Sequence, residues 1–135
     1  MNLKKLIDQL IEHEGLRLKP YVCSAGKLTI GIGRNLVGKG ISEREARFLL
    51  DNDIQECYDD LLPLFINFNM MPESIQRVLI DMRFNLGGKG FRSFKKMITA
   101  VNNRNMEEMI KQMRDSSWYT QVKTRADNLI RLIEG

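Results

Sequence analysis

The sequence has few of the side chains that bind metals or build disulfide frameworks. It contains two cysteines, Cys23 and Cys57, and one histidine, His13, in 135 residues. The cysteine spacing matches no disulfide framework and no metal-binding motif. Structural zinc takes four cysteine or histidine ligands in most proteins, so a zinc site is not expected. We therefore predict a protein that holds no metal.

Long apolar segments are also absent. No apolar run approaches the roughly 18–20 residues that span a bilayer, and residues 1–8 are too charged for the apolar segment of a signal peptide. We expect synthesis in a cytoplasm, without stable insertion in a membrane. A chain of 135 residues without repeats or low-complexity tracts indicates one domain, large enough for a hydrophobic core without disulfides.

The charge is modestly positive. A formal net charge of +4 favours acidic partners such as cell-wall polymers, nucleic acid or anionic lipid. The same charge is also compatible with a solvated, slightly basic surface. The basic residues are dispersed among acidic ones and no nucleic-acid-binding motif is found, so we expect no nucleic-acid partner.

The first residues predict an amphipathic helix that ends at Gly15. Its apolar positions follow the i, i+3, i+4, i+7 spacing of a helix: Leu3, Leu6, Ile7, Leu10 and Ile11. Glu14 lies eleven residues after Leu3, and at about 100° per residue the two share nearly the same angle. The Glu14 carboxylate is thus expected along the apolar face, at the helix end, and Gly15 is a typical terminator.

A short sheet is predicted next. Residues 16–21 can run extended, Ser24-Ala25-Gly26 indicates a turn, and residues 28–33 alternate apolar side chains with Thr29 and two glycines. One face of this second strand is apolar, and the other is nearly bare except for the Thr29 hydroxyl. A bare face allows a ligand or another backbone to come close.

The remainder predicts a series of helices. An S-x-x-E capping box opens the first of them, and apolar residues at helical spacing recur to the end of the chain, where one or two helices carry Trp118. The expected start and stop signals are, in chain order, Ser42–Glu45, Pro63, Pro72, Gly87–Gly88, Ser93 and Asn105.

This order of elements indicates an α+β fold, with the sheet confined to an N-terminal lobe. Within a single domain of residues 1–135 we predict a small β lobe over 15–41 and a linking helix over 42–62. Residues 1–14 and 63–135 are predicted to form the helical lobe. Glu14 would then lie at the lobe junction, where ligand clefts are common.

Three side chains in the N-terminal stretch are candidates for chemistry. Glycoside hydrolysis needs a proton donor with a raised pKa, and Glu14 fits because burial along an apolar face favours the neutral form. From position alone, an ordinary surface residue at a helix end is the more common case. Cys23 is either a structural thiol or a base or nucleophile. Thr29 either holds a water molecule or is a plain strand residue.

The chain resembles the T-even phage lysozymes and related phage endolysins. The spacing Glu14-x8-Cys23-x5-Thr29 is similar to the catalytic Glu-x8-Asp/Cys-x5-Thr pattern of that family. Similarity extends over nearly the whole chain, through residues 14–21, 28–33, 41–46, 84–87, 90–91 and 118–126. The resemblance implies a lysozyme-like fold, in which a long helix joins the two lobes and the active-site cleft lies between them.

The resemblance also implies roles for the three candidates. Glu14 would be the general acid, and Thr29 would help to position the attacking water. Cys23 stands where the best-known members have Asp. As a thiolate it could activate or orient the water, stabilise positive charge on the sugar, or act as a nucleophile. We favour water activation with inversion, because the threonine is retained.

Further positions follow from the resemblance alone. Arg125 matches the arginine that pairs with the catalytic glutamate. Cleft positions that contact the saccharide are matched by Asn35, Phe84, Asn85 and Gln112. The loop over 35–40 is shorter than in the T-even enzyme, which implies a smaller sheet lobe and a more open cleft.

The function predicted from the sequence is that of an endolysin-type muramidase. It would hydrolyse the β-1,4 bond between N-acetylmuramic acid and N-acetylglucosamine in bacterial peptidoglycan, as a monomer and without a cofactor. Such an enzyme waits in the host cytoplasm until a holin opens the membrane, and then acts on the periplasmic peptidoglycan. The alternative is a catalytically impaired lysozyme-like domain that binds peptidoglycan or a protein.

Overall fold

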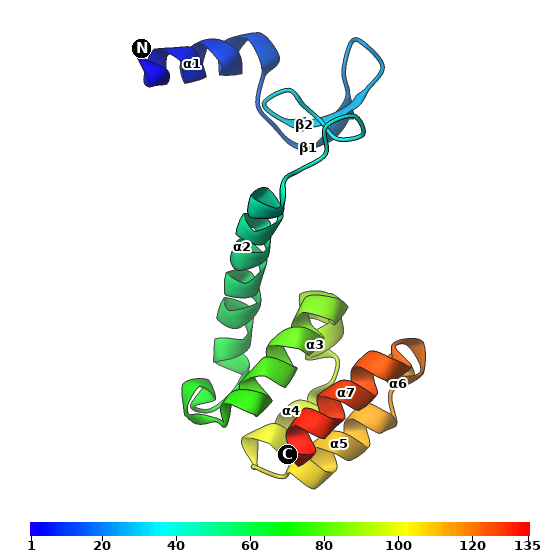
Figure 1. Ribbon diagram of the computed structural model, residues 1–135. Coiled ribbons are helices and arrows are strands. Elements are labelled where there is room, and N and C mark those ends of the chain that lie inside the picture. Colours follow the sequence, from blue (N-terminus) through cyan, green and yellow to red (C-terminus); the bar gives the residue numbers. More distant parts are fainter. The chain divides into compact units, whose positions relative to one another are not determined.

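A computed structural model describes residues 1–135 as two compact units, Met1–Phe48 and Leu49–Gly135. The chain contains seven α-helices and one three-stranded sheet (Figure 1), which confirms the predicted α+β class. None of the helices combines the length and the apolar content needed to cross a bilayer.

The first unit begins with helix α1 (Leu3–Glu14). Asn2 caps its start, since its side-chain Oδ1 accepts a hydrogen bond from the Lys5 amide at 3.0 Å. Gly15 ends it with a φ of +78°, a conformation that favours glycine. The predicted helix and its terminator are both confirmed.

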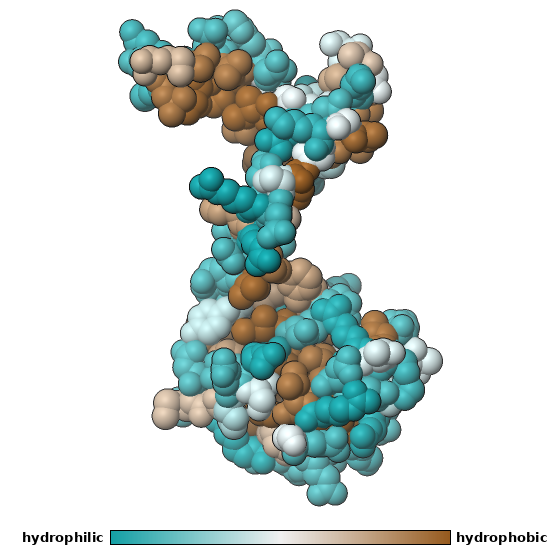
Figure 2. All heavy atoms as spheres, viewed as in Figure 1, coloured by the Kyte–Doolittle hydropathy of each residue, from teal (hydrophilic) through white to brown (hydrophobic).

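Apolar side chains form a stripe along α1, as the spacing predicts, and Figure 2 shows this stripe as a continuous apolar surface. No residue of α1 is buried in the first unit. The packing of residues 1–14 with the helical lobe stays a prediction.

Three antiparallel strands follow in the order β1 (Arg17–Val22), β2 (Leu28–Gly31) and β3 (Arg34–Asn35). The predicted strand over residues 28–33 is therefore two residues too long. Gly31 and Gly33 have φ values of +69° and +67°, and these left-handed conformations turn the chain back into β3.

Thr29 lies in the middle of the sheet, opposite Tyr21 in β1 and Asn35 in β3. It is only 4% exposed and is the single buried residue of the first unit, while the neighbouring Leu28 is exposed. The covered face of β2 is thus the one that carries the hydroxyl.

Helix α2 (Glu43–Leu61) starts with the predicted capping box. The Ser42 amide donates to Glu45 Oε1 at 2.9 Å, and the Glu45 amide donates to Ser42 Oγ at 3.1 Å. Arg34 adds a third contact, with its Nη1 at 2.9 Å from the Glu45 carboxylate and 3.2 Å from the Gly40 carbonyl. The start of α2 is in this way tied to β3 and to the loop after it.

These contacts lower the pKa of Glu45 to about 2, mainly through the Arg34 guanidinium and then through Ser42. Because the pKa of Glu45 is lower in the folded than in the unfolded chain, its contacts stabilise the fold. This stabilisation is complete above the unfolded pKa of about 4.5 and is lost as the pH falls toward 2. We expect Glu45→Gln to lower the urea midpoint at pH 7 and to have progressively less effect below about pH 4. Glu43→Gln is the matched control, because its pair with Arg47 is exposed and should change the midpoint little at either pH.

Helix α2 ends before Pro63, which lies in a 3-10 turn, Leu62–Leu64. A second 3-10 turn, Phe68–Met70, precedes the long helix α3 (Glu73–Arg92). The remaining helices are α4 (Lys95–Asn102), α5 (Met106–Arg114), α6 (Ser117–Gln121) and α7 (Lys123–Glu134).

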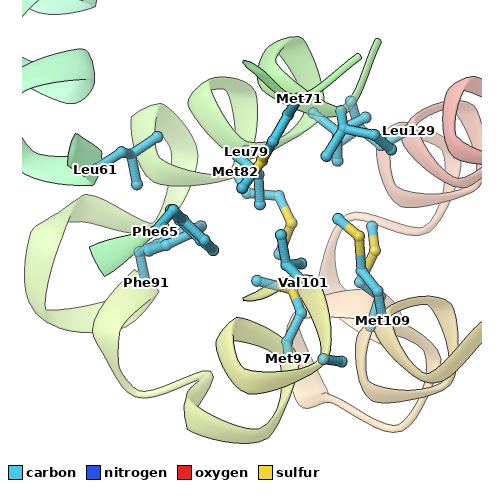
Figure 3. Close-up of a cluster of buried hydrophobic side chains, with 14 of the residues drawn as sticks. Leu61, Phe65, Met71, Leu79, Met82, Phe91, Met97, Val101, Met109 and Leu129 are labelled. Atoms are coloured by element: carbon cyan, nitrogen blue, oxygen red, sulfur yellow. The ribbon is translucent and has the colours of Figure 1, made fainter. Parts of the chain in front are cut away.

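The hydrophobic core lies in the second unit and is formed by α3 to α7 together with the end of α2 (Figure 3). Five of the eight methionines are among its buried side chains: Met71, Met82, Met97, Met109 and Met113. Unbranched thioether side chains adapt to irregular gaps between helices, which suits a core assembled from several short ones.

The predicted helix end at Gly87–Gly88 is confirmed, since Gly87 breaks α3 with φ 76° and ψ 168°. Helical turns then resume and continue to Arg92, so α3 consists of two helical parts joined at a kink. A Cβ atom on Gly88 would lie 2.9 Å from Asp60 Oδ2 and 2.8 Å from Arg92 Nη1. Glycine at 88 therefore makes room for the Asp60–Arg92 ion pair that joins α2 to the end of α3.

The sequence predicts that Ser93 caps α4, and this prediction is wrong. Its hydroxyl donates to the Gly90 carbonyl at 2.6 Å and so closes α3, while Phe94 is the N-cap residue of α4. The predicted Asn105 cap is confirmed, since its Oδ1 accepts from the Glu108 amide at 3.1 Å.

Candidate active site

Glu14 is the last residue of α1, and its carboxyl group lies against the turn between β2 and β3. A Cβ atom on Gly33 would be 2.7 Å from Glu14 Oε2 and 2.9 Å from Glu14 Cδ. The carboxyl group can take this position only because residue 33 has no side chain. The absence of that side chain thus leaves room for the candidate proton donor.

Gly33→Ala is expected to displace the Glu14 carboxyl group and to lower the rate of substrate cleavage roughly 100-fold, the cost of about 1 Å of misplacement. The left-handed φ adds backbone strain of about 1–2 kcal/mol. Gly31→Ala is the matched control, because its φ is nearly the same and a Cβ atom there would meet nothing within 4 Å. Both variants should lose similar stability in urea unfolding, and only Gly33→Ala should lose most of its activity. Equal activity in the two variants would contradict the role of Gly33.

Cys23 lies in the turn that joins β1 to β2. The turn is closed by two backbone hydrogen bonds, from the Cys23 amide to the Lys27 carbonyl at 2.9 Å and from the Gly26 amide to the Cys23 carbonyl at 2.8 Å. The Cys23 thiol is half-buried. Its pKa is lowered, because the backbone amide of Lys27, and after it that of Ala25 and the Thr29 hydroxyl, favour the thiolate.

Thr29 stands opposite Tyr21 in the β1–β2 hairpin, and Tyr21 lies two residues before Cys23. The Thr29 hydroxyl donates to the Lys27 carbonyl at 2.8 Å, and a hydroxyl has only one proton to donate. The predicted roles of Cys23 and Thr29 in catalysis stay predictions.

The second cysteine has the opposite environment. Cys57 is buried in the second unit, and this burial raises its pKa. The two free thiols therefore differ in both access and acidity.

Asn35 stands directly opposite Thr29 in the β2–β3 ladder. Its side-chain Oδ1 accepts from the Gly38 amide at 2.8 Å, and its carbonyl accepts from the amides of Lys39 and Gly40. Asn35 thus shapes the short loop after β3, and its side-chain amide group keeps both N–H donors. Its predicted contact with a saccharide stays a prediction.

Two of the predicted site residues of the second unit lie at one hollow of about 460 Å³. Phe84 is 45% exposed there, and the Arg125 Nε atom donates to Asp81 Oδ1 at 2.8 Å. Apolar side chains of α2, α3 and α7 complete the lining. The predicted pairing of Arg125 with Glu14 is untested, and within its own unit Arg125 is paired with Asp81.

The other two residues that are predicted to contact the saccharide, Gln112 and Asn85, make hydrogen bonds within the second unit. Gln112 Nε2 donates to Glu108 Oε1 at 2.8 Å, one turn earlier on α5. Asn85 Oδ1 accepts from the indole Nε1 of Trp118 at 2.8 Å. The sequence analysis assigns no role to Gly33 or Trp118. The bare strand face predicted over residues 28–33 does indicate that another group can come close to Gly33.

Comparison with known proteins gives the same family for nearly the whole chain. The model of the phage lysozyme family matches residues 11–131. The chain is 30% identical to the pre-baseplate central spike protein Gp5 of Enterobacteria phage T4, over 95% of the chain and 27% of that protein. It is 23% identical to "Probable T4-type lysozyme 2" of Dictyostelium discoideum, over 98% of the chain and 95% of that protein.

A third relative is the peptidoglycan hydrolase gp36 of Pseudomonas phage phiKMV, with 25% identity over 91% of the chain and 14% of that protein. The chain thus spans about a quarter of the spike protein and a smaller share of the hydrolase, but nearly all of the Dictyostelium protein.

Proposed function

Because the chain belongs to the phage lysozyme family, we propose that it is a muramidase that hydrolyses the β-1,4 bond between N-acetylmuramic acid and N-acetylglucosamine. Two of its relatives are named for lysozyme or peptidoglycan hydrolase activity. The positive net charge of the chain favours its approach to the anionic cell wall.

In the proposed mechanism Glu14 protonates the glycosidic oxygen as the bond breaks. A water molecule held by Thr29 attacks the anomeric carbon from the opposite face, and the Cys23 thiolate accepts a proton from this water. The product would have the inverted configuration. Glu14 is then regenerated by proton exchange with solvent, and the Cys23 thiol loses its proton again.

The observation that carries this proposal is the position of Cys23 in the β1–β2 turn, two residues after Tyr21, which stands opposite Thr29. The amides of Lys27 and Ala25 and the Thr29 hydroxyl favour the thiolate, which is the form that a water-activating base must take. The hydroxyl that would orient the water belongs to Thr29, on the strand that follows this turn.

The proposal is tested with purified peptidoglycan and the full chain. A muramidase lowers the turbidity of the suspension and releases disaccharide-peptides that end in a reducing N-acetylmuramic acid, identified by mass spectrometry. Reducing N-acetylglucosamine ends, or cleaved peptide bonds without new reducing sugar, would contradict the proposal. NMR of the newly formed anomer decides between inversion and retention.

The alternative function is binding of peptidoglycan or of a protein without cleavage. It is favoured by Cys23 in the position where the family's best-known members have Asp. Sedimentation of the chain with walls, without release of reducing ends by the correctly folded protein, would support this alternative.

We propose in addition that the muramidase acts as an endolysin. It would be made in the host cytoplasm and would reach the periplasmic peptidoglycan after a holin opens the membrane. Similarity to a phage spike protein favours a second setting, in which the same domain serves within a phage particle. Expression of the chain with and without a holin in a bacterial host distinguishes the two, since an endolysin lyses the cells only with the holin.

A further inference from the structure

The positive charge of the chain is unevenly distributed. The formal net charge of +4 comes entirely from the first unit, Met1–Phe48, which has nine basic and five acidic residues, whereas the second unit has twelve of each. Within the first unit, residues 15–42 carry five basic side chains and no acidic one. This stretch contains the whole sheet. The sheet therefore has a positive surface potential, which attracts anionic partners.

Most of the cations of this stretch have no carboxylate partner. Arg34 is paired with Glu45. The other four are exposed and make no ion pair: Arg17, Lys19, Lys27 and Lys39. The Arg17 guanidinium lies 4.6 Å from the centroid of the Tyr21 ring, a contact that leaves its charge in place. An anionic surface can thus approach these side chains without breaking a salt bridge first.

The same hairpin exposes aliphatic side chains. Val22 in β1 stands opposite Leu28 in β2, and both are exposed on the sheet face that is opposite to Thr29. Leu16 is exposed as well, and Leu18 is 82% exposed in the part of β1 where the register is irregular. Such irregularities can direct a side chain away from the sheet. Figure 2 shows apolar side chains among hydrophilic ones over this part of the first unit.

Two other kinds of partner match this surface poorly. β1 is an outer strand, but Pro20 has no amide N–H to donate, and a bulged register and the charge of Lys19 also oppose pairing with another strand. Aliphatic side chains gain free energy by leaving water, and a hydrated polysaccharide offers them no dry medium. The combination of free cations with exposed leucines matches a partner that is anionic outside and apolar within.

We propose that β1 docks on the surface of an anionic phospholipid bilayer. Leu16 and Leu18 enter the boundary between head groups and acyl chains, and the neighbouring Arg17 and Lys19 bind the lipid phosphates. Long basic side chains can extend from an apolar surface to the head groups, so both kinds of contact form together. The inference goes beyond the proposed function, because it requires no cleavage of the wall.

The test is sedimentation of the full chain with vesicles. Vesicles of equal parts phosphatidylcholine and phosphatidylglycerol should bind the wild type, more weakly as the salt concentration rises, and vesicles of phosphatidylcholine alone should bind it far less. Leu18→Ser should weaken binding to the anionic vesicles roughly tenfold, since it removes most of a buried leucine. Lys19→Gln should weaken it about fivefold, the contribution of one cation at an anionic surface.

Matched control variants lie in the second unit. Met70 is as exposed as Leu18, and Lys95 is exposed and makes no ion pair. Met70→Ser and Lys95→Gln should each leave vesicle binding within about twofold of the wild type. Far-UV circular dichroism checks that all four variants are folded.

Absence of binding to the anionic vesicles would overturn the inference, as would equal binding to both kinds of vesicle or an equal loss in Met70→Ser and Leu18→Ser. Weaker binding of Leu18→Ser to purified peptidoglycan, with unchanged vesicle binding, would also overturn it and assign this surface to the wall. A chain that cleaves no peptidoglycan but shows the expected vesicle pattern would contradict the proposed function and still support the docking of β1.

Discussion

Glu14→Gln is expected to lower the rate of peptidoglycan cleavage by about 10²–10⁴-fold, the usual contribution of a positioned general acid. Glutamine has nearly the same shape and can occupy the space beside Gly33, but it has no acidic proton for the leaving oxygen. The measurement is the release of reducing N-acetylmuramic acid ends per molecule of enzyme. Thermal unfolding of the first unit should be close to that of the wild type, because the carboxyl group makes no ion pair within this unit.

The matched control is Glu12→Gln. This change removes the same charge two residues earlier on the same exposed helix, so it reports any general effect of charge on binding to the anionic wall. It should leave the cleavage rate within about twofold of the wild type. A Glu14→Gln protein that keeps half of the wild-type activity would exclude Glu14 as the acid.

Cys23→Asp is expected to be at least as active as the wild type, whereas Cys23→Ala loses most of its activity. A free carboxylic acid loses its proton about four pH units before a free thiol, which is the reverse of the order that an acid–base pair needs. With ordinary pKa values, only about one molecule in ten thousand would carry a protonated glutamic acid and a thiolate together. The lowered pKa of Cys23 increases this fraction, and an aspartate in its place increases it much further.

The same reasoning fixes the sign of the pH dependence. If the thiolate is the base, wild-type activity rises as the pH rises through the pKa of Cys23, and this limb lies at lower pH than for an ordinary thiol because that pKa is lowered. In Cys23→Asp the corresponding limb should move to about pH 4. Profiles of kcat/KM against pH for the two proteins measure the displacement.

Alkylation by iodoacetamide gives an independent measure of the thiolate. Cys23 should react at a rate that follows its ionisation, and the buried Cys57 should stay unmodified in the folded protein. If the wild type, Cys23→Asp and Cys23→Ala cleave peptidoglycan equally well, Cys23 has no part in the mechanism.

Local signals explain why much of the secondary structure could be predicted from the sequence. The Ser42–Glu45 capping box and the Asn105 cap depend on residues within one helical turn, and both are confirmed. Gly15 ends α1 for the same local reason. The predicted end of β2 was wrong, because a glycine pattern does not reveal which glycine turns the chain, and Gly31 does so two residues early. Gly87 breaks α3 as predicted, but the sequence does not predict the helical turns that follow it.

In the candidate site, too, the local features could be predicted from the sequence and the long-range contacts could not. Cys23 and Thr29 are six residues apart on a predicted turn and strand, and both lie in the β1–β2 hairpin. The approach of Glu14 to the Gly33 backbone and the bond from Trp118 to Asn85 join elements distant in the sequence. Such contacts depend on how the elements pack, and no periodicity or spacing in the chain encodes that packing.

The five buried methionines of the second unit have a consequence for oxidative chemistry. Peroxide converts an accessible thioether to a polar sulfoxide, which disrupts a core. Met70, at 81% exposed, can be oxidised in the folded state, whereas Met82, Met97, Met109 and Met113 have no exposed surface. Oxidation of these four therefore requires the helices to open. Their rate of sulfoxide formation, followed by peptide mass spectrometry, therefore measures how fast the core opens, with Met70 as the internal reference.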